Sequence, residues 1–295
     1  MSSKNKPKKS SKIERSAEIK EIILPSPEYS FEKDDVFGRK PFAKKLTKAI
    51  KAFCPLEDEA YVLSLNGSYG SGKTTFLRMW ENLLQEDHKI DAIYINAWES
   101  DFDEEPLIPI LTSLLNKLEN DIELDKAAKT AMGSVANDFI AHWTGVKVAK
   151  AIQAASESGD IQAEGAAVYR DFWFKKKAFI KLKQCIQDYL VENEKILLVF
   201  VDELDRARPN YSIKFLETIK HIFNIQNVCF VLAIDRKQLQ EITYKLYGKI
   251  DFENYFLRFV TRELDLPQSK ERGREDFAKI NFEKNFKKLG SVVIF

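Results

Sequence analysis

A chain of 295 residues is long enough to bury the core of one large α/β domain. Hydrophobic residues make up 44% of it and charged residues 31%, which is typical of a globular protein. The formal net charge of +1 gives no overall electrostatic reason to bind nucleic acid or an anionic membrane. No apolar run approaches the roughly 18 residues that a membrane span needs, and no secretory signal precedes the domain, so we expect a cytoplasmic protein with no transmembrane segment.

Residues 1–20 are predicted to form a disordered basic tail. Lysines and serines dominate the first twelve positions, and almost nothing there is apolar enough to be buried. A basic tail can contact nucleic acid or an acidic protein, but Glu14 and Glu18 close behind it favour a solvated arm. The composition therefore allows nucleic acid as a partner but does not point to it.

Helices and strands alternate from residue 34 onward. Apolar residues spaced by three or four predict an amphipathic helix over residues 42–53, and a short β-rich run predicts a buried strand over residues 61–66. We expect a second helix from about residue 74, a second strand over residues 92–98 and a long helix over residues 108–118.

Two unbroken apolar runs, at residues 196–201 and 228–234, predict fully buried strands, and an aspartate follows each of them. Helices are expected at residues 179–189 and 212–223. This alternation predicts an α/β fold with a mostly parallel sheet, whose ligand crevice lies along the carboxyl ends of the strands. Residues 126–165 are alanine-rich and interrupted by glycines, so we expect an insertion of irregular helices there.

Residues 67–74 fit the phosphate-binding pattern G-x-x-x-x-G-K-[ST] in full, between a predicted strand and a predicted helix. Glycines in this loop permit the tight curvature that turns backbone N–H groups toward phosphate oxygens. Lys73 is expected to reach the β- and γ-phosphates as a catalytic cation, and the Thr74 hydroxyl is expected to ligate Mg²⁺. The predicted nucleotide contacts are Gly67, Ser68, Tyr69, Gly70, Ser71, Gly72, Lys73, Thr74 and Thr75.

Two adjacent carboxylates, Asp202 and Glu203, follow the first of the buried apolar strands. Asp202 fits a ligand that binds Mg²⁺ through water, as in a Walker B motif. Glu203 fits the residue that orients or deprotonates the attacking water. Two acids after a strand can instead complement the dipole of a following helix, but the complete phosphate-binding loop favours the catalytic interpretation.

Several further positions have two open interpretations. Asp235 ends the second apolar strand, where it either senses the γ-phosphate or caps the strand end. Trp98 also follows a strand and is expected to pack beside the nucleotide rather than to react. Four arginines are candidates for an arginine finger or are ordinary surface residues: Arg206, Arg208, Arg258 and Arg262.

At these residues the chain resembles the KAP family of P-loop NTPases. The resemblance runs from residue 35 to residue 268, and it implies a KAP-type P-loop NTPase domain at residues 30–268. That fold has a mostly parallel sheet sandwiched by helices and a helical insertion between the two Walker motifs. Phe37-Gly38-Arg39 also resembles an adenine-side element of related signalling ATPases, which implies that Arg39 contacts the nucleotide. The segments that carry the resemblance are residues 67–74, Ile95-Asn96-Ala97-Trp98, Val201-Asp202-Glu203-Leu204-Asp205-Arg206, and residues 254–259 running to Leu266-Pro267.

Two features depart from the family pattern. Many members carry transmembrane helices between the Walker motifs, whereas residues 132–152 contain polar and charged side chains that favour the soluble, bacterial type. Members also continue into a helical region after the L-P block, and here we expect only a shortened part of it, as a C-terminal tail at residues 269–295. The polar and charged residues are Asn137, Asp138, His142, Lys147 and Lys150.

The resemblance implies Mg²⁺-dependent ATP binding and hydrolysis by a molecular switch, with a role in bacterial defence against phage by family analogy alone. Two alternatives stay open: a nucleotide-binding scaffold with little turnover, and a DNA-dependent ATPase. Glu203 favours hydrolysis, and the short C-terminal tail favours the scaffold. Besides ATP, the partners to consider are an unidentified protein and a second copy of the chain in a homo-oligomer.

Overall fold

The computed structural model describes residues 29–120, 133–134 and 161–268 of the chain. The predicted basic tail and the C-terminal tail lie outside the described residues. So does the predicted insertion, apart from residues 133–134 and 161–165.

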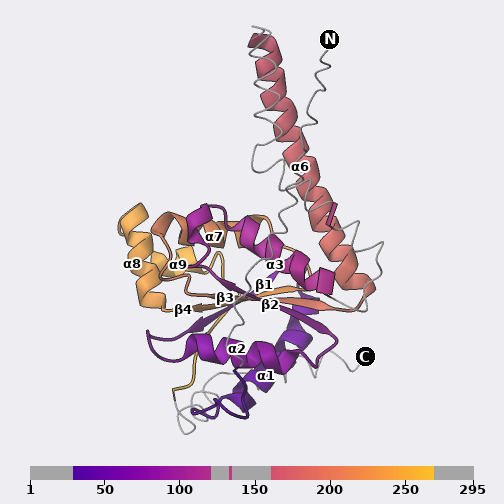
Figure 1. Ribbon diagram of the computed structural model, residues 1–295. Coiled ribbons are helices and arrows are strands. Elements are labelled where there is room, and N and C mark those ends of the chain that lie inside the picture. Colours follow the sequence, from indigo (N-terminus) through magenta and orange to yellow (C-terminus); the bar gives the residue numbers. More distant parts are fainter. Residues whose placement is uncertain (1–28, 121–132, 135–160, 269–295) are drawn as a thin grey trace, which may run out of the picture.

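Five strands form one parallel sheet in the order β2-β3-β4-β1-β5 (Figure 1). The predicted parallel α/β fold is therefore confirmed. One strand, β5, was not expected: it has only four residues, nearly all of them exposed, and so it lacks an apolar pattern. The strands are β1 (Tyr61–Asn66), β2 (Ile90–Asn96), β3 (Ile196–Asp202), β4 (Val228–Ile234) and β5 (Arg262–Asp265).

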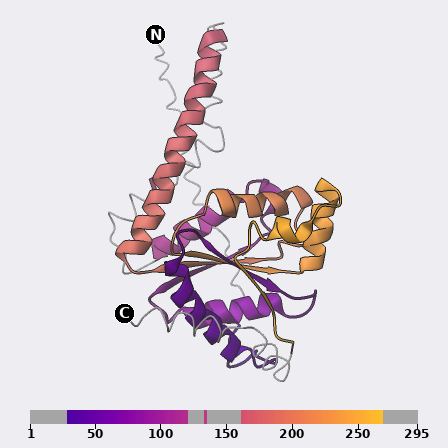
Figure 2. The same cartoon turned by 180° about the vertical axis from the view of Figure 1, so that it is seen from behind.

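Helices cover both faces of the sheet (Figures 1 and 2). Helices α1 and α2 pack on one face, and α3, α7 and α8 pack on the other together with the carboxyl end of α6. Two short 3-10 helices, Cys54–Leu56 and Asp101–Asp103, complete the connections. The α-helices are α1 (Lys40–Phe53), α2 (Lys73–Leu84), α3 (Leu107–Asn120), α6 (Ile161–Glu192), α7 (Pro209–His221), α8 (Arg236–Tyr247) and α9 (Phe252–Phe256).

Every residue of β3 and β4 is buried, which explains their unbroken apolar sequences. Successive side chains of a strand point to opposite faces, so Leu198 and Phe200 join the cluster under α1 and α2. Leu197, Val199 and Val201 join the cluster under the other helices. The central strands thus stabilise both layers at once.

Helix α6 extends well beyond the body of the domain, and only its carboxyl end packs on the sheet (Figures 1 and 2). The helix expected at residues 179–189 is this packed end of a much longer element. Within the described residues, no helix combines the length and the apolar character that crossing a membrane would require.

A buried polar network ties the end of α6 to the start of β2 and β3. Tyr189 donates a hydrogen bond of 2.7 Å to Asp91, and the Lys195 ammonium lies 3.4 Å from the same carboxylate. Both ionic side chains are about nine-tenths buried. A surface ion pair between Lys89 and Glu194 joins the same two chain segments, at 3.3 Å.

We expect Asp91→Ala to lower the free energy of unfolding by about 1.5–3 kcal/mol, because it removes a buried carboxylate that accepts from Tyr189 and pairs with Lys195. The control Lys89→Ala removes the neighbouring surface pair and should change stability by less than about 1 kcal/mol. Urea denaturation of both variants measures the difference. Equal losses in the two variants would show that the buried network contributes no more than the surface pair.

Candidate functional site

The phosphate-binding loop connects β1 to α2, as its sequence predicted. Gly70 and Gly72 have φ angles of 76° and 81°, a left-handed conformation that glycine adopts without steric cost. A Cβ atom at Gly67 would lie 2.6 Å from the Ser71 hydroxyl oxygen, so a larger residue there would require the Ser71 side chain to move. The loop therefore curves tightly enough for its N–H groups and the amino end of α2 to face one anion.

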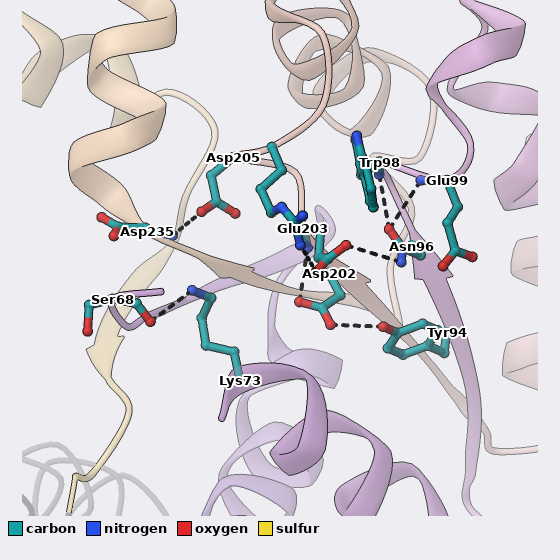
Figure 3. A network of polar contacts seen from close by, with 11 residues as sticks. Ser68, Lys73, Tyr94, Asn96, Trp98, Glu99, Asp202, Glu203, Asp205 and Asp235 are labelled. Atoms are coloured by element: carbon teal, nitrogen blue, oxygen red, sulfur yellow. Dashed lines mark hydrogen bonds and ion pairs between the residues drawn. The ribbon is translucent and has the colours of Figure 1, made fainter. Parts of the chain in front are cut away.

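Lys73 is the first residue of α2, and its side chain turns back into the loop. Its Nζ donates to the Gly67 carbonyl oxygen at 2.6 Å and lies 3.4 Å from the Ser68 carbonyl oxygen (Figure 3). The ammonium is thus held on the concave side of the loop.

Asp202 ends β3 with its side chain fully buried. Its Oδ2 accepts a hydrogen bond of 2.8 Å from the Tyr94 hydroxyl, and its Oδ1 accepts one of 2.9 Å from the Glu203 backbone N–H (Figure 3). Burial raises the pKa of the Asp202 carboxyl, and hydrogen bonds from Thr74 and Tyr94 oppose that rise. The effect of Thr74 on this pKa places the phosphate-binding loop beside the end of β3.

The donor set at this point suits Mg²⁺. Thr74 and Asp202 both offer oxygen, which hard divalent cations prefer. A hydroxyl can donate to the carboxylate and still offer a lone pair to a metal. Mg²⁺ typically takes one or two ligands from the protein and the rest from phosphate and water.

Glu203 adopts a left-handed backbone conformation with φ of 56°, which costs a non-glycine residue of order 1 kcal/mol or more. Its Oε1 pairs with the Arg206 guanidinium at 2.5 Å, and its Oε2 lies 3.4 Å from the Asn96 amide nitrogen (Figure 3). The unusual backbone directs this carboxylate away from Asp202 and toward β2. The two adjacent acids therefore have separate surroundings, as their different predicted roles require.

Arg206 is the one candidate finger that contacts a predicted catalytic residue among the described contacts. Its guanidinium also lies 4.4 Å from the Trp98 ring and 5.6 Å from the Tyr69 ring. The Trp98 side chain is about half exposed, and it packs against Arg206 and not in the core. Its backbone N–H donates to the Asn96 side chain, which supports the turn after β2.

The other three arginines lie elsewhere. Arg208 pairs with Asp101 at 3.5 Å, beside the 3-10 helix that precedes α3. Arg258 lines a cavity of about 450 Å³ near the amino end of β1. Arg262 begins the exposed edge strand β5.

Asp205 and Asp235 join the loop after β3 to the end of β4. Asp205 Oδ2 accepts a hydrogen bond of 3.0 Å from the Asp235 N–H (Figure 3). Burial raises the pKa of the Asp205 carboxyl, and the positive charge of Lys73 opposes the rise. The Asp235 carboxylate accepts from the Lys237 N–H at 3.1 Å, so it caps α8. The observed contacts of Asp235 are those of a helix N-cap.

Arg39 lies behind the phosphate-binding loop with only 2% of its surface exposed. Its Nε donates to the Pro267 carbonyl oxygen at 2.6 Å, and its two terminal nitrogens donate to the carbonyl oxygens of Ser71 at 2.8 Å and Gly72 at 3.3 Å. Burial lowers the pKa of this guanidinium to about 10, so it stays charged at neutral pH. Arg39 therefore ties the loop to the segment after β5.

Two side chains of the site could not be identified from motif spacing: Tyr94 and Asp205. Tyr94 lies within a strand, where an aromatic residue is ordinary, and Asp205 was recognised only as part of the block that resembles a family motif. The available signal for Tyr94 is its position two residues before Asn96, on a strand whose end pairs with Asp202.

Comparison with known proteins gives a family match and a number of more distant similarities. The model of the KAP family P-loop domain matches residues 39–293. The phage T7 exclusion protein of Escherichia coli strain K12 is 23% identical over 252 residues, which are 80% of this chain and 34% of that protein. The chain thus spans about a third of the length of this curated relative.

Among solved structures, the ORC2 protein of Aeropyrum pernix, determined in ADPNP-ADP complexes, matches with a TM-score of 0.41 and 14% identity. That match covers 77% of this chain and 47% of the other. Cdc6p of Pyrobaculum aerophilum matches with a TM-score of 0.36 and 13% identity, covering 76% of this chain and 44% of the other.

We expect Arg39→Ala to lower the free energy of unfolding by about 2–4 kcal/mol, since it removes charge-assisted hydrogen bonds to three buried or partly buried carbonyl groups. The neighbouring control Lys40→Ala removes only a surface pair with Glu32 and should change stability by less than about 1 kcal/mol. Urea denaturation measures both values. If Arg39→Ala kept full stability but lost the preference for adenine over guanine nucleotides, Arg39 would contact the base instead.

Proposed function

Because this chain belongs to the KAP family of P-loop domains, we propose that it binds ATP together with Mg²⁺ and hydrolyses the bond between the β- and γ-phosphates. The observation that carries the proposal is the meeting of two distant segments at one edge of the sheet. Thr74 of the phosphate-binding loop lies close enough to Asp202 of β3, 128 residues later in the chain, to help lower the pKa of its carboxyl. Glu203 follows directly and has its own set of partners.

In this proposal the loop and Lys73 bind the phosphates. Backbone N–H groups and the amino end of α2 offer partial positive charge, and the ammonium adds a full one. Thr74 and Asp202 would hold Mg²⁺, which neutralises charge on the phosphate oxygens when it is bound. Catalysis of this kind depends on positioning and electrostatics more than on covalent chemistry.

Glu203 is assigned to the attacking water. Its carboxylate is held at both oxygens, by Arg206 and by Asn96, which fixes its direction. The water must compete with these two donors for the same oxygens. Arg206, already in the site, is the arginine best placed to move from Glu203 to the phosphates as charge develops there.

The second candidate function is a nucleotide-binding scaffold with little turnover. It is favoured by the same contacts of Glu203, because Arg206 and Asn96 occupy the carboxylate oxygens that would otherwise accept from the attacking water.

At the level of biology, we propose that the chain acts as an ATP-dependent molecular switch in bacterial defence against phage. This part rests on the similarity to the phage T7 exclusion protein, of which the chain matches about a third. A cytoplasmic location, an unidentified protein partner and assembly into a homo-oligomer belong to the same proposal.

We expect Lys73→Ala to weaken ATP binding by at least about 10-fold, because the variant lacks the cation that the loop holds for the β- and γ-phosphates. Isothermal titration calorimetry measures the affinity. The control Lys220→Ala removes a surface lysine that pairs with Glu59, and its ATP affinity should match the wild type. Equal affinities in Lys73→Ala and the wild type would refute the assignment of the phosphate site.

Glu203→Gln should retain ATP but lose hydrolysis by about 100-fold or more, since glutamine keeps the size of the side chain and removes its basicity. Glu194→Gln is a matched control: Glu194 is also a glutamate with a left-handed backbone, φ of 50°, and its surface pair with Lys89 lies at the amino ends of β2 and β3. ATP affinity, phosphate release and melting temperature should be measured for both. Normal turnover in a folded Glu203→Gln variant would contradict the catalytic role.

A further inference from the structure

We propose that Tyr94 is a positioning residue for the metal site: its hydroxyl fixes the Asp202 carboxylate in the orientation in which it and Thr74 face one Mg²⁺ ion. This inference rests on the proposed function above. It concerns a residue of β2 that belongs to neither Walker motif.

The first observation is that each oxygen of the Asp202 carboxylate has its own donor. Tyr94 binds Oδ2 at 2.8 Å, and the Glu203 backbone N–H binds Oδ1 at 2.9 Å. The backbone donor alone would leave the carboxylate free to rotate about its own bond to Cβ. With both donors in place the carboxylate plane is fixed, and each oxygen keeps lone pairs for further partners.

The second observation is that the Tyr94 ring is itself held in place. The Arg78 guanidinium carbon lies 3.3 Å from the ring centroid, and Arg78 also pairs with Glu81 at 3.0 Å. A guanidinium over an aromatic face stabilises the ring position by electrostatic attraction and packing. The hydroxyl of Tyr94 therefore reaches Asp202 from a defined direction.

The third observation is that Thr74, near Asp202, and Arg78, over the Tyr94 ring, belong to the same helix, α2. Thr74 and Arg78 are four residues apart in α2, so they lie on one face of it. Thr74 lies near Asp202 and influences the pKa of its carboxyl, Asp202 accepts from Tyr94, and Tyr94 packs against Arg78. This closed set of contacts joins α2, β2 and β3, and it couples the position of one proposed metal ligand to that of the other.

The fourth observation concerns burial. Asp202 is fully buried, so its carboxylate depends on donors of the protein, and the Tyr94 hydroxyl is one of them. Mg²⁺ requires near-ideal octahedral geometry, and residues behind the ligands typically change metal affinity by about 10–100-fold.

The same strand provides a matched comparison. At the amino end of β2, Tyr189 donates to Asp91 at 2.7 Å, so it makes the same kind of tyrosine–aspartate bond away from the proposed site. A tyrosine that only stabilises the fold should behave like Tyr189. A tyrosine that positions a metal ligand should behave differently in one specific measurement, the affinity for Mg²⁺.

The test is a Mg²⁺ titration of ATP binding to the full chain. In Tyr94→Phe we expect the half-saturating Mg²⁺ concentration to rise by about 10-fold, because the ring stays and only the donor to Asp202 is lost. ATP binding measured in EDTA should equal that of the wild type. Tyr189→Phe should lose stability in urea denaturation and keep the wild-type Mg²⁺ requirement.

Arg78→Gln gives a second test from α2, in case Tyr94→Phe folds poorly. It leaves the hydroxyl in place and removes the guanidinium over the ring, so the Mg²⁺ requirement should rise in the same direction by a smaller factor. A wild-type Mg²⁺ requirement in a folded Tyr94→Phe variant, or in Arg78→Gln if Tyr94→Phe does not fold, would overturn the assignment of Tyr94 alone. If the ATP affinity of the wild type did not depend on Mg²⁺, both the proposed function and this assignment would be overturned.

Discussion

The parallel register of the central strands determines where the polar groups of the site lie. Asn96 is paired with Asp202, and Asp202 with Ala233, so β2, β3 and β4 end at the same edge of the sheet. A shift of one residue in β3 would reverse the face of every side chain on it and would move Asp202 away from Tyr94 and Thr74. Such a shift would also exchange the β3 side chains between the two apolar clusters, where they pack against different neighbours.

The site concentrates features that destabilise a fold locally. Asp202 is a fully buried carboxylate, and Glu203 has a strained backbone. Burial of a charge is tolerated only where donors surround it, and here the donors are the Tyr94 hydroxyl of β2 and the next backbone N–H. The two apolar layers on either side of the sheet supply the stability that offsets these costs.

Motif and periodicity predicted the elements whose signal is local. The apolar runs of β3 and β4 gave two buried strands, and the loop between β1 and α2 follows its predicted pattern. Contacts between distant segments could not be read in this way. The position of Arg39 behind the loop depends on the carbonyl group of Pro267, and spacing along the chain does not encode such a pairing. Strand β5 gave no signal because its residues are mostly exposed at the sheet edge.

Steady-state phosphate release by the purified wild-type chain tests the central claim most directly. We predict that ATP is hydrolysed in the presence of Mg²⁺, that EDTA abolishes the reaction, and that added DNA leaves the rate unchanged. Turnover that required DNA would favour a DNA-dependent ATPase, and tight ATP binding without turnover would favour the scaffold. Phosphate release at an equal rate with Mg²⁺ and with EDTA would contradict the assignment of Thr74 and Asp202 to a metal ion.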